Sequence, residues 1–433
     1  FLNENHINSK IDFTKNYEVD GEKGKFKFGG LGTYQTRNFQ IARFQISCFD
    51  TPDMWTSING QPDSILATSN LVSYNNNVGS YVNPRATITE QSNQFDAQKT
   101  NFTVYVSNEL KLFGVFRTIV GLRAEMFDLY YTGSNSSGDS YLNENVISKL
   151  DLFPSINIIY QVNENSNLRT SATRTTARPS FKEASIAQIY DPLSNMTFIG
   201  NIDIQPTYIQ NYDLRYEYFG QYSQMFAFSL FYKNFTDPIE MTYYEAAPNN
   251  LTPKNLGSAI VGGVEIEMRK NLSFIHSSLR DFSVNVNISF IESRLTYAES
   301  ERNLRENTLK DGQTLGTYRT LQGQAPFLIN SGINYANPDK GIQTGIFYNV
   351  QGRTLEVVGT GFFPDVYTIP FNSLNFNFNK TLGKDRRSTL NVRVNNILGD
   401  IKESMIQPFR ADELHFRMRN PGRTISLGYK LRF

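Results

Sequence analysis

Long segments in which apolar and polar residues alternate strictly are the feature that most constrains how this chain folds. Near the C-terminus, Ile425, Leu427 and Tyr429 alternate with Ser426 and Gly428. Side chains two residues apart lie on the same face of a strand, so such a segment has one apolar face and one polar face. The same period of two recurs at 212–218, 282–290, 374–379 and 390–395.

The polar faces of these segments carry mainly uncharged side chains. Charged residues make up 19% of the chain and aromatic residues 13%. A soluble β-sandwich usually has Lys and Glu on its polar face and strands of about 5–6 residues, whereas these segments are longer and amide-rich. The pattern favours a large β protein with one face in lipid.

The composition also excludes several classes of protein. The 42 Lys and Arg residues against 41 Asp and Glu leave a formal charge of +1, whereas a nucleic-acid-binding protein needs a basic field. A single Cys excludes a disulfide framework, and His6, His276 and His415 are too scattered for a metal centre. No run of about 18 apolar residues is present, which excludes transmembrane helices. We expect no cofactor, no metal and no nucleic-acid partner.

The connections between the alternating segments define the fold class. Short turn-like connections, such as 20–24 and 337–340, alternate with long ones. This is the pattern of an outer-membrane barrel, in which the sheet must close because lipid offers the backbone no hydrogen-bond partner. We therefore expect an all-β, transmembrane, antiparallel up-and-down β-barrel. The strands are predicted near 8–19, 24–46, 96–111, 113–131, 149–161, 166–176, 207–219, 225–237, 258–270, 281–296, 327–336, 341–350, 367–380, 388–397 and 423–433. The long connections are predicted at 47–95, 132–148, 177–206, 238–257, 297–326, 351–366 and 398–422.

Three details of this pattern concern its ends and its regularity. About fifteen strands is an odd number, whereas bacterial barrels have an even one, so either the count is off by one or the first strands are missing. The chain begins at Phe1 without a signal-peptide pattern, which predicts a processed product or a fragment, and Phe433 closes the last strand as in many outer-membrane barrels. Between Ile41 and Phe44 the alternation changes phase, which predicts a bulge.

Several motifs resemble one known family. The segment NLRTSATRTTARPSF at 167–181 resembles a signature stretch of TonB-dependent outer-membrane receptors. GNIDIQP at 200–206 and NYDLRYEY at 211–218 are similar to the parts that follow, although three positions of the former depart from the family's usual Pro, Leu and Lys. Four further stretches resemble the Bacteroidetes-type branch: 322–335, 348–352, 395–398 and 420–423.

The resemblance implies both a larger barrel and a function. The family has a 22-stranded barrel preceded by a plug domain that carries a TonB-binding motif. Residues 1–433 would then be one domain, the last 15 or so of 22 strands, with the plug and the first strands outside this sequence. The implied function is an outer-membrane receptor that binds a scarce solute at the cell surface and imports it. The implied partners are TonB with its inner-membrane motor, outer-membrane lipid and the solute, and the sequence leaves open whether a surface lipoprotein caps the barrel.

The motifs that suggest an enzyme all have simpler interpretations. Gly29–Gly32 lies within a predicted strand without a following helix, so it is not a dinucleotide-binding loop. Glu265 and Glu267 share a strand face and are interpreted as lining of the lumen rather than as a glycosidase pair. Ser, His and Asp form no nucleophile elbow. We expect no enzymatic activity.

Candidate solute contacts lie in the long connections, because loops often carry function. Trp55, Tyr190, Tyr318 and Arg319 offer aromatic rings or a guanidinium group there, and Arg178 opens the connection after strand 166–176. For Arg178 the sequence favours a structural role, because the proline that follows cannot donate to the ladder and ends the strand.

Aromatic residues near strand ends are predicted to form an interfacial girdle in the membrane instead of contacting a ligand. They are Tyr130, Tyr131, Phe363 and Tyr367.

Two other kinds of protein share part of this pattern. A passive porin or a barrel used in secretion or assembly has similar strands, and an upstream plug with a TonB motif would favour active import instead. A soluble β-sandwich module would extract without detergent. The solute stays open among an iron chelate, cobalamin, a glycan and a peptide. The connections predict a periplasmic C-terminus, with the long loops outside the cell.

Overall fold

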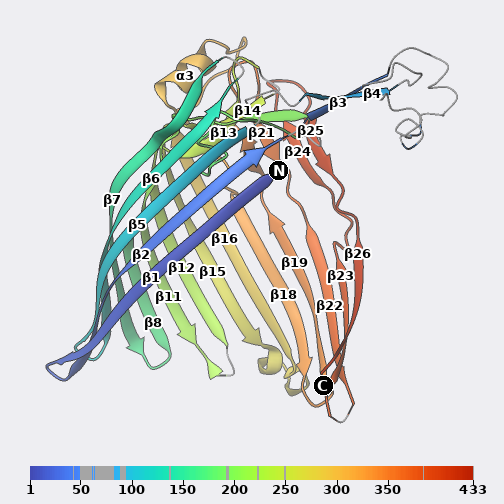
Figure 1. The fold of residues 1–433 in the computed structure, drawn as a ribbon. Coiled ribbons are helices and arrows are strands. Elements are labelled where there is room, and N and C mark those ends of the chain that lie inside the picture. The colour runs from blue at the N-terminus through green and yellow to red at the C-terminus, as the bar shows by residue number, and fades with distance from the viewer. Residues whose placement is uncertain are drawn as a thin grey trace.

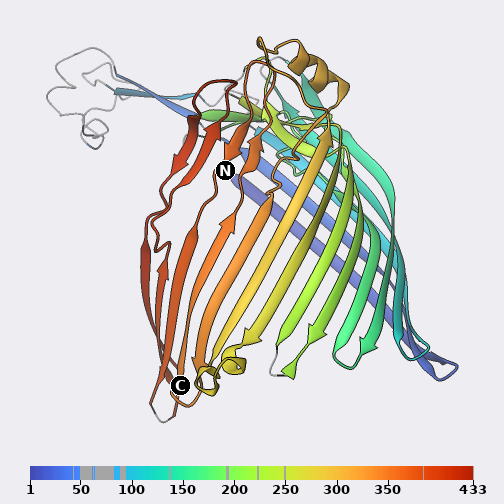
Figure 2. The same cartoon turned by 180° about the vertical axis from the view of Figure 1, so that it is seen from behind.

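The computed structural model describes residues 1–41, 43–48, 61, 63, 82–87, 94–135, 138–191, 195–221, 224–247, 250–383 and 385–432. Its dominant feature is one antiparallel sheet of 16 strands that curves into an arc (Figures 1 and 2). Fifteen of these strands follow one another in chain order, which confirms the predicted up-and-down sheet. They are β1 (Leu2–Val19), β2 (Glu22–Gln40), β5 (Gln94–Leu112), β6 (Phe116–Ser134), β7 (Ser140–Asn163), β8 (Ser166–Ala177), β11 (Thr207–Phe219), β12 (Met225–Thr236), β15 (Ser258–Asn271), β16 (Phe282–Thr296), β18 (Phe327–Asn337), β19 (Ile342–Gln351), β22 (Ser373–Leu382), β23 (Ser388–Asn395) and β26 (Thr424–Leu431). The sixteenth, β17 (Tyr318–Arg319), pairs with β16.

The register separates the two faces as the alternation predicts. On the outer face Tyr212 pairs with Tyr232 and Leu214 with Leu230, and all four side chains are exposed. The inner face of the same strands carries polar groups such as Arg215. In a membrane the exposed apolar side chains contact lipid and the polar face lines the lumen.

Tight turns lie at one end of the sheet and long connections at the other (Figure 1). The β1–β2 hairpin turns at Asp20 and Gly21, whose φ angles of 50° and 77° are those of a two-residue hairpin turn. The β15–β16 connection contains two short 3₁₀ helices, η4 (Leu272–Phe274) and η5 (Ser277–Leu279).

Strand lengths differ strongly around the arc. β7 has 24 residues, whereas β26 has 8. The prediction of a long connection at 132–148 was therefore wrong: β6 and β7 stay paired up to Ser134 and Ser140. Tyr131 on the inner face of β6 belongs to a buried hydrophobic cluster. This packing supports the part of β6 and β7 that continues beyond the alternating segments.

A second strand prediction also needs correction. The predicted strand at 24–46 is two strands, because β2 ends at Gln40 and β3 (Arg43–Cys48) pairs with β4 (Val82–Thr87) outside the main sheet. The phase change seen in the sequence marks this break rather than a bulge within one strand.

The two ends of the arc are β1 and β26. In the part of the chain that the structure describes, β1 pairs with β2 alone and β26 with β23 alone. The sheet is therefore an open arc of a barrel wall.

Two small sheets and a helix form a cap at the long-connection end (Figure 1). The first sheet contains β9 (Gln188–Asp191), β10 (Met196–Ile199), β13 (Ile239–Tyr243) and β14 (Asn250–Asn255). The second contains β20 (Thr354–Val357), β21 (Val366–Thr368), β24 (Lys402–Ile406) and β25 (Leu414–Arg419), and the helix is α3 (Glu299–Glu306). The sequence predicted loops at these positions, except that it predicted one strand at 367–380, which the structure divides between β21 of the cap and β22 of the main sheet.

A hydrophobic core joins the cap to the inner face of the arc. Phe181 and Ile204, from the connection after β8, are buried against Phe127, Leu129 and Tyr131 of β6. Tyr131 is 1% exposed, so the prediction that it belongs to a lipid-facing girdle is wrong.

Two other girdle candidates also lie elsewhere. Phe363 packs against the ring of Tyr243 in the cap, and Tyr367 lies in β21. Tyr367 is in a cap sheet and Phe363 is in the connection between β20 and β21, so the girdle prediction is wrong for them too. Alternation locates a strand end but not what covers it.

Candidate functional site

The cap is a connected unit because its two small sheets are bridged. Thr242 of β13 forms a parallel bridge with Val358, and its hydroxyl donates to the Val358 carbonyl at 3.0 Å. The Val358 amide donates in turn to the Met241 carbonyl at 3.0 Å. Segments about 116 positions apart are thereby fixed to each other.

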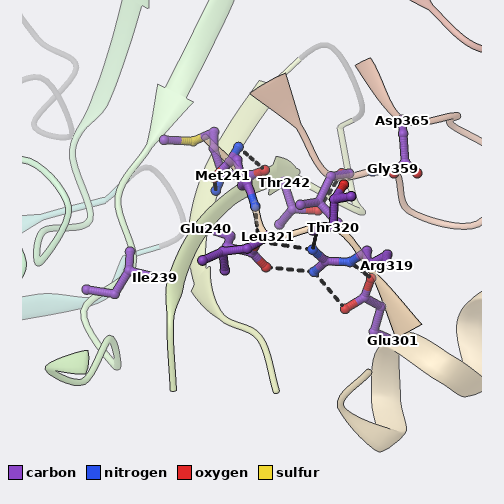
Figure 3. Close-up of polar contacts among 12 residues, drawn as sticks. Ile239, Glu240, Met241, Thr242, Glu301, Arg319, Thr320, Leu321, Gly359 and Asp365 are labelled. Carbon is purple, nitrogen blue, oxygen red and sulfur yellow. Dashed lines mark hydrogen bonds and ion pairs between the residues drawn. The ribbon is translucent and has the colours of Figure 1, made fainter. Parts of the chain in front are cut away.

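Arg319 occupies the centre of the cap, and all of its donors are used (Figure 3). Nη1 and Nη2 donate to the two carboxylate oxygens of Glu240 at 3.0 and 2.6 Å. Nε and Nη2 donate to Glu301 at 2.8 and 3.1 Å, and Nη1 also donates to the Thr320 carbonyl at 3.1 Å. A guanidinium has five N–H donors, so these five bonds satisfy it completely. Arg319 and Glu301 are 8% exposed and Glu240 is 2% exposed.

The network continues from Glu301 to the connection between β20 and β21. Arg305 of α3 donates to Glu301 at 3.0 Å and to Asp365 at 2.9 Å. Asp365 also accepts from the Gly359 amide at 2.7 Å. We call the five charged residues Glu240, Glu301, Arg305, Arg319 and Asp365 the loop clasp.

Gln322 closes the loop clasp against β13. Its amide N–H donates to Glu240 at 2.7 Å, its side-chain oxygen accepts from the Met241 amide at 2.5 Å, and its side-chain amide donates to the Met241 carbonyl at 3.0 Å. The loop 297–326 is therefore bound to β13 by both side-chain and backbone groups.

The electrostatics of the loop clasp follow from its burial. Burial alone would lower the pKa of Arg319, but the hydrogen bonds from Glu240 and Glu301 outweigh it, so that pKa lies above its usual range. Burial raises the pKa of Glu240, and the Arg319 hydrogen bonds act against that rise. Three carboxylates face two guanidinium groups, so one negative charge is left in excess.

The inner wall below the cap carries a second set of charges. Arg215 of β11 donates to Glu217 at 2.8 Å, to Glu267 of β15 at 2.9 Å and to Ser229 at 3.0 Å. Arg169 of β8 pairs with Glu217 at 2.6 Å. Glu267 and Glu265 of β15 therefore face the lumen side, as the alternation predicts, and Glu265 lines the concavity described next.

This charged wall borders a concavity of about 580 Å³ on the inner face of β7, β8, β11, β12 and β15. Lys233 lies at its rim, where its ammonium group donates to Asn211 at 2.9 Å. The concavity presents both cationic and anionic side chains to the lumen.

Arg178 is placed by internal carboxylates. Its guanidinium lies 2.6 Å from Glu125 and 3.5 Å from Asp151, and over the ring of Phe127 at 4.4 Å. These contacts tie the start of the 178–206 connection to the inner wall. They agree with the structural role that the sequence favours, and solute contact by Arg178 stays a prediction.

The other candidates are separated in the structure. Tyr318 is 48% exposed beside Arg294, and Tyr190 is 38% exposed with its hydroxyl donating to Asn195 at 2.8 Å. Arg319 is buried in the loop clasp, and Trp55 lies outside the described residues. Tyr318 and Arg319 are neighbours on β17 whose side chains point to opposite faces, one exposed and one buried, so the structure does not join these candidates into one site.

Of the five loop-clasp residues, the sequence singles out only Arg319. Glu301 and Arg305 stand four positions apart, which is a helix-pair signal that could have been found. Glu240 and Arg319 are 79 positions apart, and nothing in the local sequence links them.

Within the described ranges, no group of three or more His, Cys, Asp or Glu side chains is arranged to hold a metal ion. The same ranges contain no helix with the length and apolar character needed to span a bilayer.

Comparison with solved structures shows what this sheet is similar to. The ferric-catecholate import receptor Fiu from E. coli matches with a TM-score of 0.61 at 12% identity, covering 100% of this chain and 55% of that one. The ferric citrate transporter FecA matches with a TM-score of 0.64 at 11% identity, with coverages of 100% and 55%. The siderophore receptor PirA from Acinetobacter baumannii matches with a TM-score of 0.57 at 13% identity, covering 100% of this chain and 55% of that one. The chain thus spans about half the length of the solved structures it matches. Comparison with curated protein sequences gives no match.

The sheet and its cap define the wall of an outer-membrane receptor barrel. The family model described as "TonB dependent receptor-like, beta-barrel" matches residues 3–397, and the chain belongs to this family. Its fold indicates an outer-membrane location, and the family is one of receptors and transporters rather than enzymes.

Proposed function

We propose that this chain forms part of an outer-membrane receptor that binds a scarce solute at the cell surface and imports it with energy from TonB. The observation that carries the proposal is the ordered cap at the long-connection end of the barrel wall. A passive pore needs no loops joined by a fully satisfied buried guanidinium, whereas a receptor needs a preorganised mouth.

The same proposal sets the orientation in the membrane. The exposed apolar face contacts outer-membrane lipid, the cap lies outside the cell, and the tight turns and the C-terminus lie in the periplasm. The plug, the TonB-binding motif and the first strands belong to sequence outside residues 1–433. TonB and its inner-membrane motor act through that region. A surface lipoprotein over the cap and the Bacteroidetes-type branch remain predictions.

Within this chain, the exposed aromatic side chains of the cap are the proposed solute contacts. Tyr190 presents its ring to solvent, whereas Arg319 and Arg178 act by holding the loops in place. The ring of Tyr318 lies beside Arg294 on the outer face of β16, so Tyr318 remains a candidate contact only for a solute at the outer rim. Trp55 remains a candidate contact. Fiu is described as a ferric-catecholate import receptor and FecA as a ferric citrate transporter, so a ferric chelate is the first solute class to test.

The test is an uptake assay with the full-length gene in its own host. A deletion strain is complemented with the gene, and uptake of radiolabelled ferric chelates is compared with and without a functional TonB. We expect uptake that saturates with solute and is lost without TonB. Diffusive uptake that persists without TonB would support the alternative of a passive porin or an assembly barrel.

A further inference from the structure

The lipid-facing side of the wall contains a groove where two strands separate. β7 and β8 pair only up to Ser155 and Thr173, although β7 continues along β6 and β8 continues along β11. The residue before Ser155 is Pro154, which has no amide hydrogen to continue the ladder. The resulting groove has a volume of about 380 Å³, and its outward-facing side chains are Val120, Pro154, Ile156, Ala172, Arg174, Gln210 and Tyr212.

The groove lies at the edge of the apolar band. Across the sheet, Ala172 pairs with Tyr212 and Tyr212 with Tyr232, which belong to that band. One step nearer the cap, Arg174 pairs with Gln210 and Gln210 with Asn234. On β8, β11 and β12 the outward side chains therefore change from apolar to polar beside the groove, as they do where lipid headgroups begin.

Arg174 is a cation without an anionic partner at this level. Nη1 donates to the Leu152 carbonyl at 3.2 Å, a group on the separated part of β7, and the guanidinium lies over the Tyr208 ring at 4.8 Å. Among the described residues, no carboxylate lies within 4.0 Å of it. The nearby Asp151 is already engaged by Tyr208 and Arg178.

Arg294 shows the difference on the same face of the sheet. It also lies over a tyrosine ring, that of Tyr318 at 5.1 Å, but it pairs with Glu292 at 2.6 Å. On this face Arg294 thus has its own carboxylate, whereas Arg174 has none among the described residues. Arg174 leaves N–H donors for an acceptor that comes from outside the chain.

We propose that this groove binds a phosphate-bearing lipid of the outer leaflet, with the phosphate on Arg174 and an acyl chain along Pro154, Ile156 and Ala172. Charge complementarity selects the headgroup, because a guanidinium recognises phosphate by paired hydrogen bonds. The apolar lower part of the groove selects a lipid over a free anion. This inference rests on the barrel fold alone and does not depend on solute import.

The experiment is native mass spectrometry of the full-length receptor in detergent with diphosphoryl lipid A as the probe. We expect wild type to retain one tightly held lipid and Arg174→Gln to bind it about tenfold more weakly, because a charge-assisted hydrogen bond is lost. Arg294→Gln is the matched control and should bind as wild type does. Ala172→Phe fills the apolar part of the groove and should also weaken binding.

Two measurements on wild type keep the proposal testable even if Arg174→Gln fails to assemble. Diacylglycerol, which lacks phosphate, should bind more weakly than lipid A, and inorganic phosphate should not displace lipid A. Equal retention of diacylglycerol and lipid A, or equal retention of lipid A by wild type and Arg174→Gln, would overturn the proposal. Displacement by inorganic phosphate would reduce the site to an anion contact and would also overturn it.

Discussion

At the residue scale, the guanidinium groups of this chain act mainly within the protein. Arg319 and Arg178 were both candidates for holding a solute, and both are placed among buried or half-buried carboxylates. The sequence shows that an arginine lies in a long connection. It does not show a partner such as Glu240, because that pairing depends on how two loops meet in space.

If the loop clasp holds the cap together, Arg319→Met should make the cap open more easily. The substitution leaves Glu240 buried without a counter-charge and leaves Glu301 with Arg305 alone, which should lower the free energy of local opening of the cap by about 3–5 kcal/mol. Chymotrypsin cleavage within 297–326 of the assembled receptor should therefore become much faster, while heat-modifiability of the barrel stays unchanged.

The control for Arg319→Met lies in the same loop. Arg302 pairs with Glu306 at 3.4 Å on the exposed side of α3, a contact worth about 0–1 kcal/mol. Arg302→Met should leave cleavage close to that of wild type. If Arg319→Met and Arg302→Met are cleaved at equal rates, the loop clasp does not hold the cap.

At the element scale, the long strands could be predicted and the cap could not. Alternation with a period of two is a local signal, and it located all fifteen strands of the main path. The cap strands are short, such as the 3 residues of β21, and their pairing partners lie far away in the sequence. The extension of β6 and β7 was missed for a related reason, because packing from the 178–206 connection sustains it.

The register of the last strand predicts opposite effects for adjacent substitutions. Leu427 pairs with Val392 on the lipid side, and Ser426 pairs with Arg393 on the lumen side. Leu427→Arg should cost about 2–4 kcal/mol near the midplane. Ser426→Arg should be tolerated. Folded yields in detergent give the comparison, and equal losses would contradict the assigned faces.

Shortening the connection 297–326 should affect more than its own segment. Surface loops contribute little to the ladder, so the barrel should still assemble, but solute uptake should be lost. Because the deletion removes Arg319 and Arg305, the segments 239–243 and 354–366 should also become protease-sensitive. An insertion in the turn at 338–341 is the control and should change neither property. Protection of 239–243 in the shortened protein would argue against a connected cap.

At the scale of the whole molecule, the arc has two edges that lipid cannot satisfy. The outer edge of β1 runs for 18 residues and that of β26 for 8. Unpaired backbone groups at such edges are costly in hydrocarbon and promote association between chains.

Residues 1–433 expressed alone should therefore aggregate instead of forming a heat-modifiable monomer. The measurement is a gel-shift assay after refolding in detergent, with the full-length receptor as the positive control. A stable monomeric barrel formed by residues 1–433 would show that β1 and β26 can close on each other.

The unequal strand lengths affect the direction from which a solute can reach the mouth of the receptor. β5, β6 and β7 contain 19, 19 and 24 residues, so at a rise of about 3.3 Å they extend about 60–80 Å, far more than a bilayer requires. Their upper outward side chains are polar, as in the hydrogen bond of 2.6 Å from Ser148 to Asp128. When the wall spans a bilayer, these strands extend it into the aqueous layer, whereas β23 and β26, with 8 residues each, do not. We therefore expect a solute that approaches over β5–β7 to meet a higher wall than one that approaches over β23 and β26.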